Sequence, residues 1–255
     1  MKTAHIFDFD DTLSHSDAMI YAHPYFQGDP VEIHRIPGLE KTRHSRLEYL
    51  PGALRYSLTS REFADLSQAM DSHGIKSIQH GGDLIDGHVV ALDFSDIVHV
   101  DHASAKPIAS GIRHLQDASQ AGSDIWVLTG RKSGDESGIA RFILQHTGVK
   151  VPVARIICVG GWGDSTHRSK GNAFVNGEIP AHVYDEIYFY DDDTRNLDEV
   201  KRTVTPITKI TVINSITGDE SSDAKDRVSR AREIRKQGQP MRRIRKLTGN
   251  KQQPQ

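Results

Sequence analysis

Residues 5–13 read HIFDFDDTL. The stretch continues an apolar segment at residues 3–7, TAHIF, which we expect to form a buried β-strand. It then places Asp8, Asp10 and Asp11 within four positions. Closely spaced carboxylates repel one another, and aspartate is a poor strand former. Something at the end of this strand must therefore offset several negative charges.

Composition is typical of a soluble globular protein. The chain has 255 residues, enough for one large domain or for a core with an insertion. We find no apolar run near the ~18 residues that span a bilayer, and the early strand leaves no room for a secretory signal. Cys158 is the single cysteine, which excludes an internal disulfide and fits a reducing compartment. We therefore expect a cytoplasmic protein without a membrane partner.

Strands and helices alternate regularly after Pro107. Strands are expected at residues 124–131, 154–161, 185–193 and 208–214, and helices at 107–122, 137–148, 166–177 and 197–205. Such alternation indicates βαβ units and a mostly parallel sheet. The sequence therefore predicts an α/β fold.

Residues 14–106 lose this periodicity. One helix is expected at 59–74, capped by Thr59 or Ser60 and ended by Gly74, and short strands are expected at 83–93 and 95–100. We interpret 14–106 as an inserted cap or substrate-shaping module. The core is then formed by residues 1–13 and 107–217.

Polar residues follow three of the predicted core strands. Asp8 and Asp10 follow the first, Thr129 ends the apolar part of the second, and Asp191 and Asp192 follow a later one. Ligands of open parallel sheets bind at the carboxyl ends of the strands, so we expect these residues to meet in one crevice. Oxygen-only ligation favours Mg²⁺. One cysteine and no close His/Cys spacing argue against a structural zinc site.

Four motifs in this order resemble those of the haloacid dehalogenase (HAD) superfamily. FDFDDTL matches its DxDxT motif, and VLTGR is similar to the second motif. Lys170 in HRSKGNAF fits the third motif, and YFYDDDTRN fits the fourth. The resemblance covers roughly residues 1–13 and 107–215. It implies a three-layer Rossmann-like core with a mostly parallel sheet and an inserted cap.

The resemblance also implies a Mg²⁺-dependent phosphomonoester hydrolase. In such an enzyme Asp8 would attack phosphorus and form an aspartyl-phosphate. Asp10 would protonate the leaving group and then activate water. Thr129 and the Gly130 amide would hold phosphate oxygens, and Lys170 would neutralise Asp8 and the transferred group.

The same resemblance implies the metal ligands. Asp8, the backbone carbonyl of Asp10, and Asp191 would hold Mg²⁺, with Asp192 as a ligand or close neighbour. Arg131 would either reach the substrate or form a buried ion pair.

The C-terminal residues 218–255 form a predicted basic tail, partly helical and then disordered. Residues 225–255 carry a net charge of +9, against −11 for the rest of the chain. The tail is either an arm for an anionic partner or a solvated extension.

Within the superfamily, the motifs are similar to polynucleotide 3′-phosphatase domains and RNA-repair HAD proteins, although Asp193 stands where those often have Arg, and Arg195 follows two positions on. We therefore expect a phosphorylated nucleotide or a nucleic-acid 3′ end as substrate. A phosphatase for a small metabolite or free nucleotide is one alternative. A nucleic-acid-binding protein with an inactive HAD core is another, and no oligomeric state is predicted.

Overall fold

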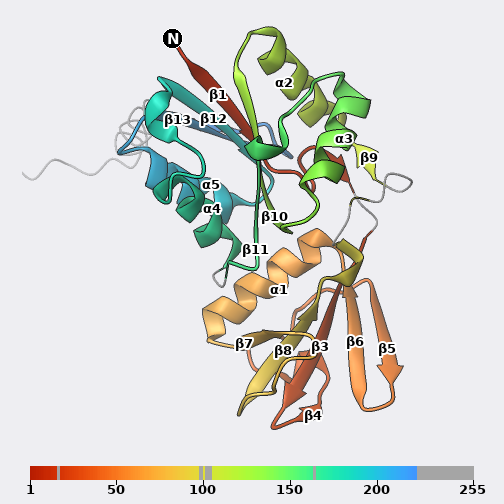
Figure 1. Cartoon of the computed structure of the whole chain (residues 1–255). Helices are drawn as coiled ribbons and strands as arrows, with labels where there is room; N and C mark the ends of the chain where they lie inside the picture. Colours follow the sequence, from red (N-terminus) through yellow and green to blue (C-terminus); the bar gives the residue numbers. More distant parts are fainter. Residues whose placement is uncertain (16–17, 98–99, 101–104, 163–164, 223–255) are drawn as a thin grey trace, which may run out of the picture.

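The computed structural model describes residues 1–15, 18–97, 100, 105–162 and 165–222 (Figure 1). Its main sheet has the strand order β11-β10-β1-β12-β13-β14. The first five strands run parallel, and β14 pairs antiparallel with β13. The strands are β1 (Thr3–Phe7), β10 (Asp124–Lys132), β11 (Ile156–Gly160), β12 (Glu186–Asp191), β13 (Lys209–Asn214) and β14 (Glu220–Ser222). The predicted α/β fold with a mostly parallel sheet is confirmed.

Helices cover both faces of this sheet (Figure 1). They are α2 (Ala109–Gln120), α3 (Glu136–Thr147), α4 (Thr166–Val175) and α5 (Thr194–Val204). Side chains alternate between the two faces of the sheet along β1. Ala4 and Ile6 belong to the hydrophobic cluster that includes Phe174 of α4, and Phe7 belongs to the cluster on the other face, with Phe142 of α3. The sheet is thus buried on both sides, as a parallel sheet requires.

A second sheet is built wholly within residues 20–93. Its order is β5-β6-β3-β8-β7, with β4 paired to β3. The strands are β3 (Ile20–Phe26), β4 (Asp29–Pro30), β5 (Arg46–Leu50), β6 (Ala53–Leu58), β7 (Lys76–Gln79) and β8 (His88–Asp93). The helix α1 (Ser60–His73) packs Leu66 and Met70 into the same cluster as Tyr56 and Val90.

The two sheets are joined where the chain leaves and re-enters the main sheet. There β2 (Ser14–His15) pairs antiparallel with β9 (Lys106–Pro107). Short 3₁₀ helices complete the described elements at Ile33–Arg35, Ser95–Ile97, Val153–Arg155 and Ala181–Val183. No helix in the described ranges is long and apolar enough to cross a membrane.

The predicted elements after Pro107 are all present, with shifted ends. α5 begins at Thr194, three residues early, because the Asp193 side chain accepts a hydrogen bond from the Arg195 amide and caps it. β10 ends one residue later than predicted, at Lys132, and its register against β11 shifts between Thr129 and Lys132.

Predictions for the insertion were less successful. The helix α1 is confirmed, with a capping box between Thr59 and Glu62. The strand expected at 95–100 is wrong over Ser95–Ile97, where the Ser95 amide donates to Asp93 and a 3₁₀ helix forms; residues 98 and 99 lie outside the described residues. The strand expected at 83–93 begins only at His88, and β3, β5, β6 and β7 were not predicted.

The sheet also extends past the predicted start of the tail at residue 218. β14 adds a further strand up to Ser222. The predicted tail helix lies in residues 223–255, outside the described residues.

Candidate active site

The main sheet brings the polar strand ends together at its centre. β1 lies between β10 and β12, and Phe7 is level with both Val127 and Tyr190. The Asp8 amide donates to the Tyr190 carbonyl at 2.8 Å, so Asp8 stands beside the end of β12. The first and fourth motifs thus meet, although their residues are far apart in the sequence.

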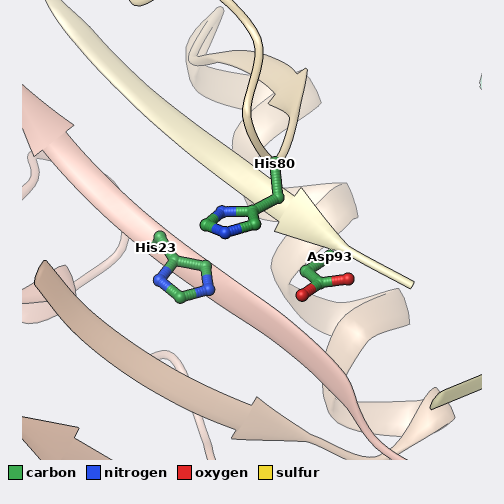
Figure 2. A group of neighbouring side chains, drawn as sticks. All are labelled: His23, His80 and Asp93. Atoms are coloured by element: carbon green, nitrogen blue, oxygen red, sulfur yellow. The ribbon is translucent and has the colours of Figure 1, made fainter. Parts of the chain in front are cut away.

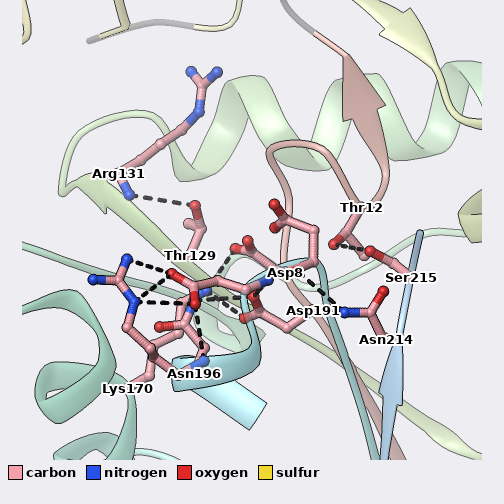
Figure 3. Close-up of polar contacts among 12 residues, drawn as sticks. Asp8, Thr12, Thr129, Arg131, Lys170, Asp191, Asn196, Asn214 and Ser215 are labelled. Atoms are coloured by element: carbon pink, nitrogen blue, oxygen red, sulfur yellow. Dashed lines mark hydrogen bonds and ion pairs between the residues drawn. The ribbon is translucent and has the colours of Figure 1, made fainter. Parts of the chain in front are cut away.

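Three carboxylates and one ammonium form the centre of the site (Figure 3). Carboxylate oxygens of Asp8, Asp191 and Asp192 all lie within 4.8 Å of one another. Lys170 Nζ lies 2.9 Å from Asp8 Oδ1 and 2.7 Å from Asp191 Oδ2. Asp8, Asp191 and Lys170 are buried, and Asp192 is partly buried.

Asp191 is held by hydrogen bonds on both of its oxygens. Oδ1 accepts from Asn196 Nδ2 and from the Asp193 amide, each at 2.9 Å, while Oδ2 faces Lys170. Asn196 comes from the first turn of α5, so the helix start and the site are built together. Asn196 was not predicted as a site residue. Its position five residues after Asp191, at the start of a predicted helix, could have indicated that it contacts Asp191.

Burial makes the carboxylates costly to ionise. Desolvation raises the pKa of Asp8 well above its usual range, and the charges of Asp191 and Asp192 raise it further, against the effect of Lys170. Burial and then Asp191 raise the pKa of Asp192 to about 7. Burial by itself lowers the pKa of Lys170, but the two carboxylates that it contacts raise it by more. Lys170 therefore remains charged.

The donor set fits a hard divalent cation. Three carboxylates face one ammonium, so when all are ionised the group carries excess negative charge in a buried place. Clustered carboxylate oxygens are the ligands that Mg²⁺ prefers in proteins. Asp8, Asp191 and Asp192 are the residues that could hold it.

The Asp10 carboxylate lies outside this group and binds Arg131. Arg131 Nη2 and Nε donate to the two Asp10 oxygens at 2.8 and 2.9 Å, and Nη1 donates to Asp135 at 3.0 Å. Arg131 is only 3% exposed. Of the two roles left open for Arg131, the structure shows the buried ion pair. Asp135, which completes it, was not recognised in the sequence.

The second motif lies at the bulge of β10. Thr129 is fully buried, and its Oγ1 accepts a hydrogen bond from the Arg131 amide at 3.3 Å. Gly130 lines the cavity described below. A Cβ atom at Gly130 would lie 3.0 Å from Thr166 Cγ2 at the start of α4, so the strand and this helix approach closely here.

A cavity of about 930 Å³ opens beside the carboxylates. Asp8 after β1, Gly130 of β10 and Lys170 of α4 contribute to its wall. The opposite wall belongs to residues 20–93 and includes Phe63 of α1 and Leu92 of β8. The insertion therefore forms part of the same cavity as the carboxylates.

The Arg195 side chain links the two walls directly. Arg195 Nη2 donates to the Ala64 carbonyl of α1 at 3.2 Å, while its guanidinium also binds Asp193. Arg195 thus connects the acidic motif to the insertion.

Comparison with protein-family models found no matching family, and a search of curated proteins found no match.

Proposed function

We propose that the chain is a Mg²⁺-dependent phosphomonoester hydrolase of the HAD type, acting through an aspartyl-phosphate on Asp8. The observation that carries the proposal is the group of three carboxylates with one buried lysine at the carboxyl ends of the central parallel strands. This is where ligands of open α/β sheets bind. The order of the four motifs supports the same interpretation.

Each residue has a role that its contacts support. Asp8 is the nucleophile, and Lys170 keeps its carboxylate in place at 2.9 Å. Bound Mg²⁺, held by Asp8, Asp191 and Asp192, supplies positive charge against which a phosphate dianion can approach. The Thr129 hydroxyl accepts from a backbone amide, which leaves its own proton to donate to a phosphate oxygen.

Asp10 acts as the general acid and base. It protonates the leaving alkoxide and later takes a proton from the attacking water. Two hydrogen bonds from Arg131 fix the orientation of its carboxylate. Because its Nε and Nη2 bind Asp10 and its Nη1 binds Asp135, we assign Arg131 to positioning Asp10, at a place where it also lines the cavity.

The substrate we propose is a phosphorylated nucleotide or nucleic-acid 3′ end. The cavity volume of about 930 Å³ lies near the upper end of the range for small-molecule pockets. Basic side chains from the core line it, namely Lys132, His167, Arg168 and Arg195. These features suit an anionic substrate larger than a simple phosphate ester. A small-metabolite phosphatase remains the alternative from the same reaction class.

The test is phosphate release with Mg²⁺ from 3′-phosphorylated oligonucleotides, 5′-phosphorylated oligonucleotides, mononucleotides and sugar phosphates. Asp8→Asn should abolish release, because an amide is a poor nucleophile. Asp11→Asn is the matched control, since it removes a charge from the same turn and asparagine tolerates the positive φ of 55° there. EDTA should stop the reaction, and Mg²⁺ should restore it.

Release of phosphate from none of these substrates would refute the hydrolase. Oligonucleotide binding without hydrolysis would then favour the nucleic-acid-binding alternative. Activity that persists in Asp8→Asn or in EDTA would refute the mechanism.

The basic tail offers a separate test of a polynucleotide substrate. Truncation after Asp223 keeps β14 and removes the basic residues 225–255. If these contact phosphates, truncation should raise KM for oligonucleotides and flatten a log–log salt dependence of roughly −0.7 per contact. Hydrolysis of a small ester should be unchanged. Identical oligonucleotide kinetics for both chains would make the tail a solvated extension.

A further inference from the structure

A second cluster of ligand-type side chains lies in the sheet of residues 20–93. It consists of His23 on β3, His80 directly after β7, and Asp93 at the end of β8 (Figure 2). His23 is level with Ala91 and Tyr21 with Asp93, so His23 and Asp93 are diagonal neighbours on one sheet face. The His80 amide donates to the Leu92 carbonyl at 2.8 Å, which holds His80 beside β8.

This face is opposite the one that packs on α1. Ala22, Val90 and Leu92 alternate with the cluster residues and join Leu66 of α1 in the hydrophobic cluster. The cluster is therefore separate from Asp8, Asp191 and Asp192. In the described part of the chain, two groups of three His, Cys, Asp or Glu side chains could hold a metal ion. One is the group of Asp8, Asp191 and Asp192, and the other is this cluster.

His23 is the unusual member. It is only 3% exposed, and neither ring nitrogen has a hydrogen-bond partner. The Leu54 backbone lies near the His23 ring and slightly raises its pKa, but it forms no hydrogen bond with either ring nitrogen. Leaving a buried polar group unsatisfied costs roughly 1–3 kcal/mol, and native proteins do so rarely. A buried imidazole with two unused nitrogens therefore indicates a missing ligand.

We propose that His23, His80 and Asp93 bind a divalent transition-metal cation, with Zn²⁺ as the simplest case. Two imidazoles and one carboxylate are a donor set that Zn²⁺ and its neighbours accept, and Mg²⁺ prefers oxygen alone. Three protein ligands would leave one position for water.

The electrostatic surroundings favour this ligation. Neutral imidazole is the form that binds metals, and the burial of the His23 ring disfavours its charged form. Arg55 is the nearby cation that would oppose a metal, but Glu48 binds it. Asp93 Oδ1 accepts from the Ser95 amide at 2.9 Å, which holds this carboxylate near His23 and His80.

Binding requires a small local rearrangement. The potential ligand atoms lie within 4.8 Å of one another, whereas donors around tetrahedral Zn²⁺ with bonds of ~2.0–2.1 Å are roughly 3.3 Å apart. The two rings are stacked, with centroids 4.4 Å apart and planes at 24°. A metal lies in the plane of each imidazole that binds it, so the rings must turn. His80 is exposed and follows the end of β7, so its side chain has room to turn.

The sequence has no closely spaced His/Cys pattern, and a structural zinc site was therefore not expected. The three residues here come from separate segments that only strand pairing brings together. A metal would tie β3, β7 and β8 to one another. Gln79 and Leu92, the chain neighbours of His80 and Asp93, line the cavity of the candidate active site.

The test uses the full-length protein in saturating Mg²⁺, so that the carboxylate group is exposed to its preferred ion. Zn²⁺ is titrated by calorimetry, and Co²⁺ is titrated by visible absorption, which reports low coordination number and nitrogen ligation. The variants are His80→Ala and Asp93→Asn, with exposed His182 in His182→Ala as the matched control. We expect one equivalent of Zn²⁺, an affinity reduced on the order of tenfold or more in the two cluster variants, and no change in the control.

His23 is tested in the unmodified protein, because its replacement could unfold the sheet. Zn²⁺ should shift the NMR signals of the His23 ring and leave those of His182 unchanged. The proposal is overturned if the full-length chain binds no Zn²⁺ at micromolar concentration. It is also overturned if both cluster variants bind as the unmodified chain does, or if Asp191→Ala abolishes binding and His80→Ala does not.

Discussion

Replacing Lys170 with methionine tests the electrostatics of the carboxylate group directly. Methionine keeps an unbranched chain of similar length but has no charge. Lys170 contacts Asp8 and Asp191 at 2.9 and 2.7 Å, with side-chain exposures of 1%, 9% and 0% for the three residues. Removing one partner from a buried ion pair typically costs about 3–5 kcal/mol, because the remaining charge has neither water nor counter-charge.

We therefore expect Lys170→Met to lower the free energy of unfolding by about 3 kcal/mol in EDTA at pH 7. The expected loss of stability is at the lower end of that range, because the raised pKa of Asp8 lets this carboxyl take up a proton when Lys170 is absent. Lys209→Met is the matched control. Its ammonium lies 2.6 Å from Glu186, which is 8% exposed, but is itself 62% exposed, so its loss should cost about 1 kcal/mol, less than the loss of Lys170.

The assay is urea denaturation followed by the fluorescence of Trp126, which is buried in β10 and reports on the main sheet. Mg²⁺ should restore much of the lost stability, since a ligand at 100 times its dissociation constant contributes about 2.7 kcal/mol. The double variant Lys170→Met with Asp8→Asn should be more stable than Lys170→Met alone. If Lys170→Met and Lys209→Met cost the same, or if Mg²⁺ has no effect on Lys170→Met, the reasoning is refuted.

Three further predictions concern other parts of the molecule. Asp10→Asn should reduce phosphate release by a factor on the order of 10²–10⁴, and full activity would reassign Asp10 to holding Arg131. Burial lowers the pKa of His5 to about 4, below the 6.5 of the unfolded chain, so stability is lost as the pH falls through this window. Between pH 7 and 5 His5 contributes a loss of about 2 kcal/mol, measured as the difference in urea denaturation between the unmodified chain and His5→Gln. Thr59→Ala should lower the stability of α1 by about 1 kcal/mol, and unchanged amide exchange in α1 would contradict this.

Local sequence patterns predicted the main sheet well because its strands are buried on both faces. TAHIF and EIYFYD are short apolar segments followed or ended by aspartates. Such segments can be recognised as strands without knowing which strands they pair with. The capping box of α1 and the left-handed Gly74 at its end are likewise local signals. The first and fourth motifs lie on these elements, so their meeting could also be predicted.

The rest depends on contacts between distant residues. β3 contains Pro24, and β5 presents mainly charged or exposed side chains, so neither has the alternation of an isolated strand. The strand at 124–131 was predicted, but its shift in register between Thr129 and Lys132 depends on pairing with β11. Arg131 is buried because Asp10 and Asp135 surround it, and only the fold brings Asp10 near.

The pairing of β2 with β9 has a consequence for how the molecule can be modified. The Ile108 amide donates to the Leu13 carbonyl at 3.0 Å, so the chain re-enters the core where it left. Gly111 of α2 packs against this crossing, where a Cβ atom would lie 2.0 Å from the Thr12 carbonyl oxygen. The entropy cost of closing a segment whose ends meet rises only slowly with its length, by about 0.6 kcal/mol for each doubling. Modules of other sizes could therefore be exchanged at this junction, which would rebuild the wall facing the carboxylates and keep the sheet that positions them.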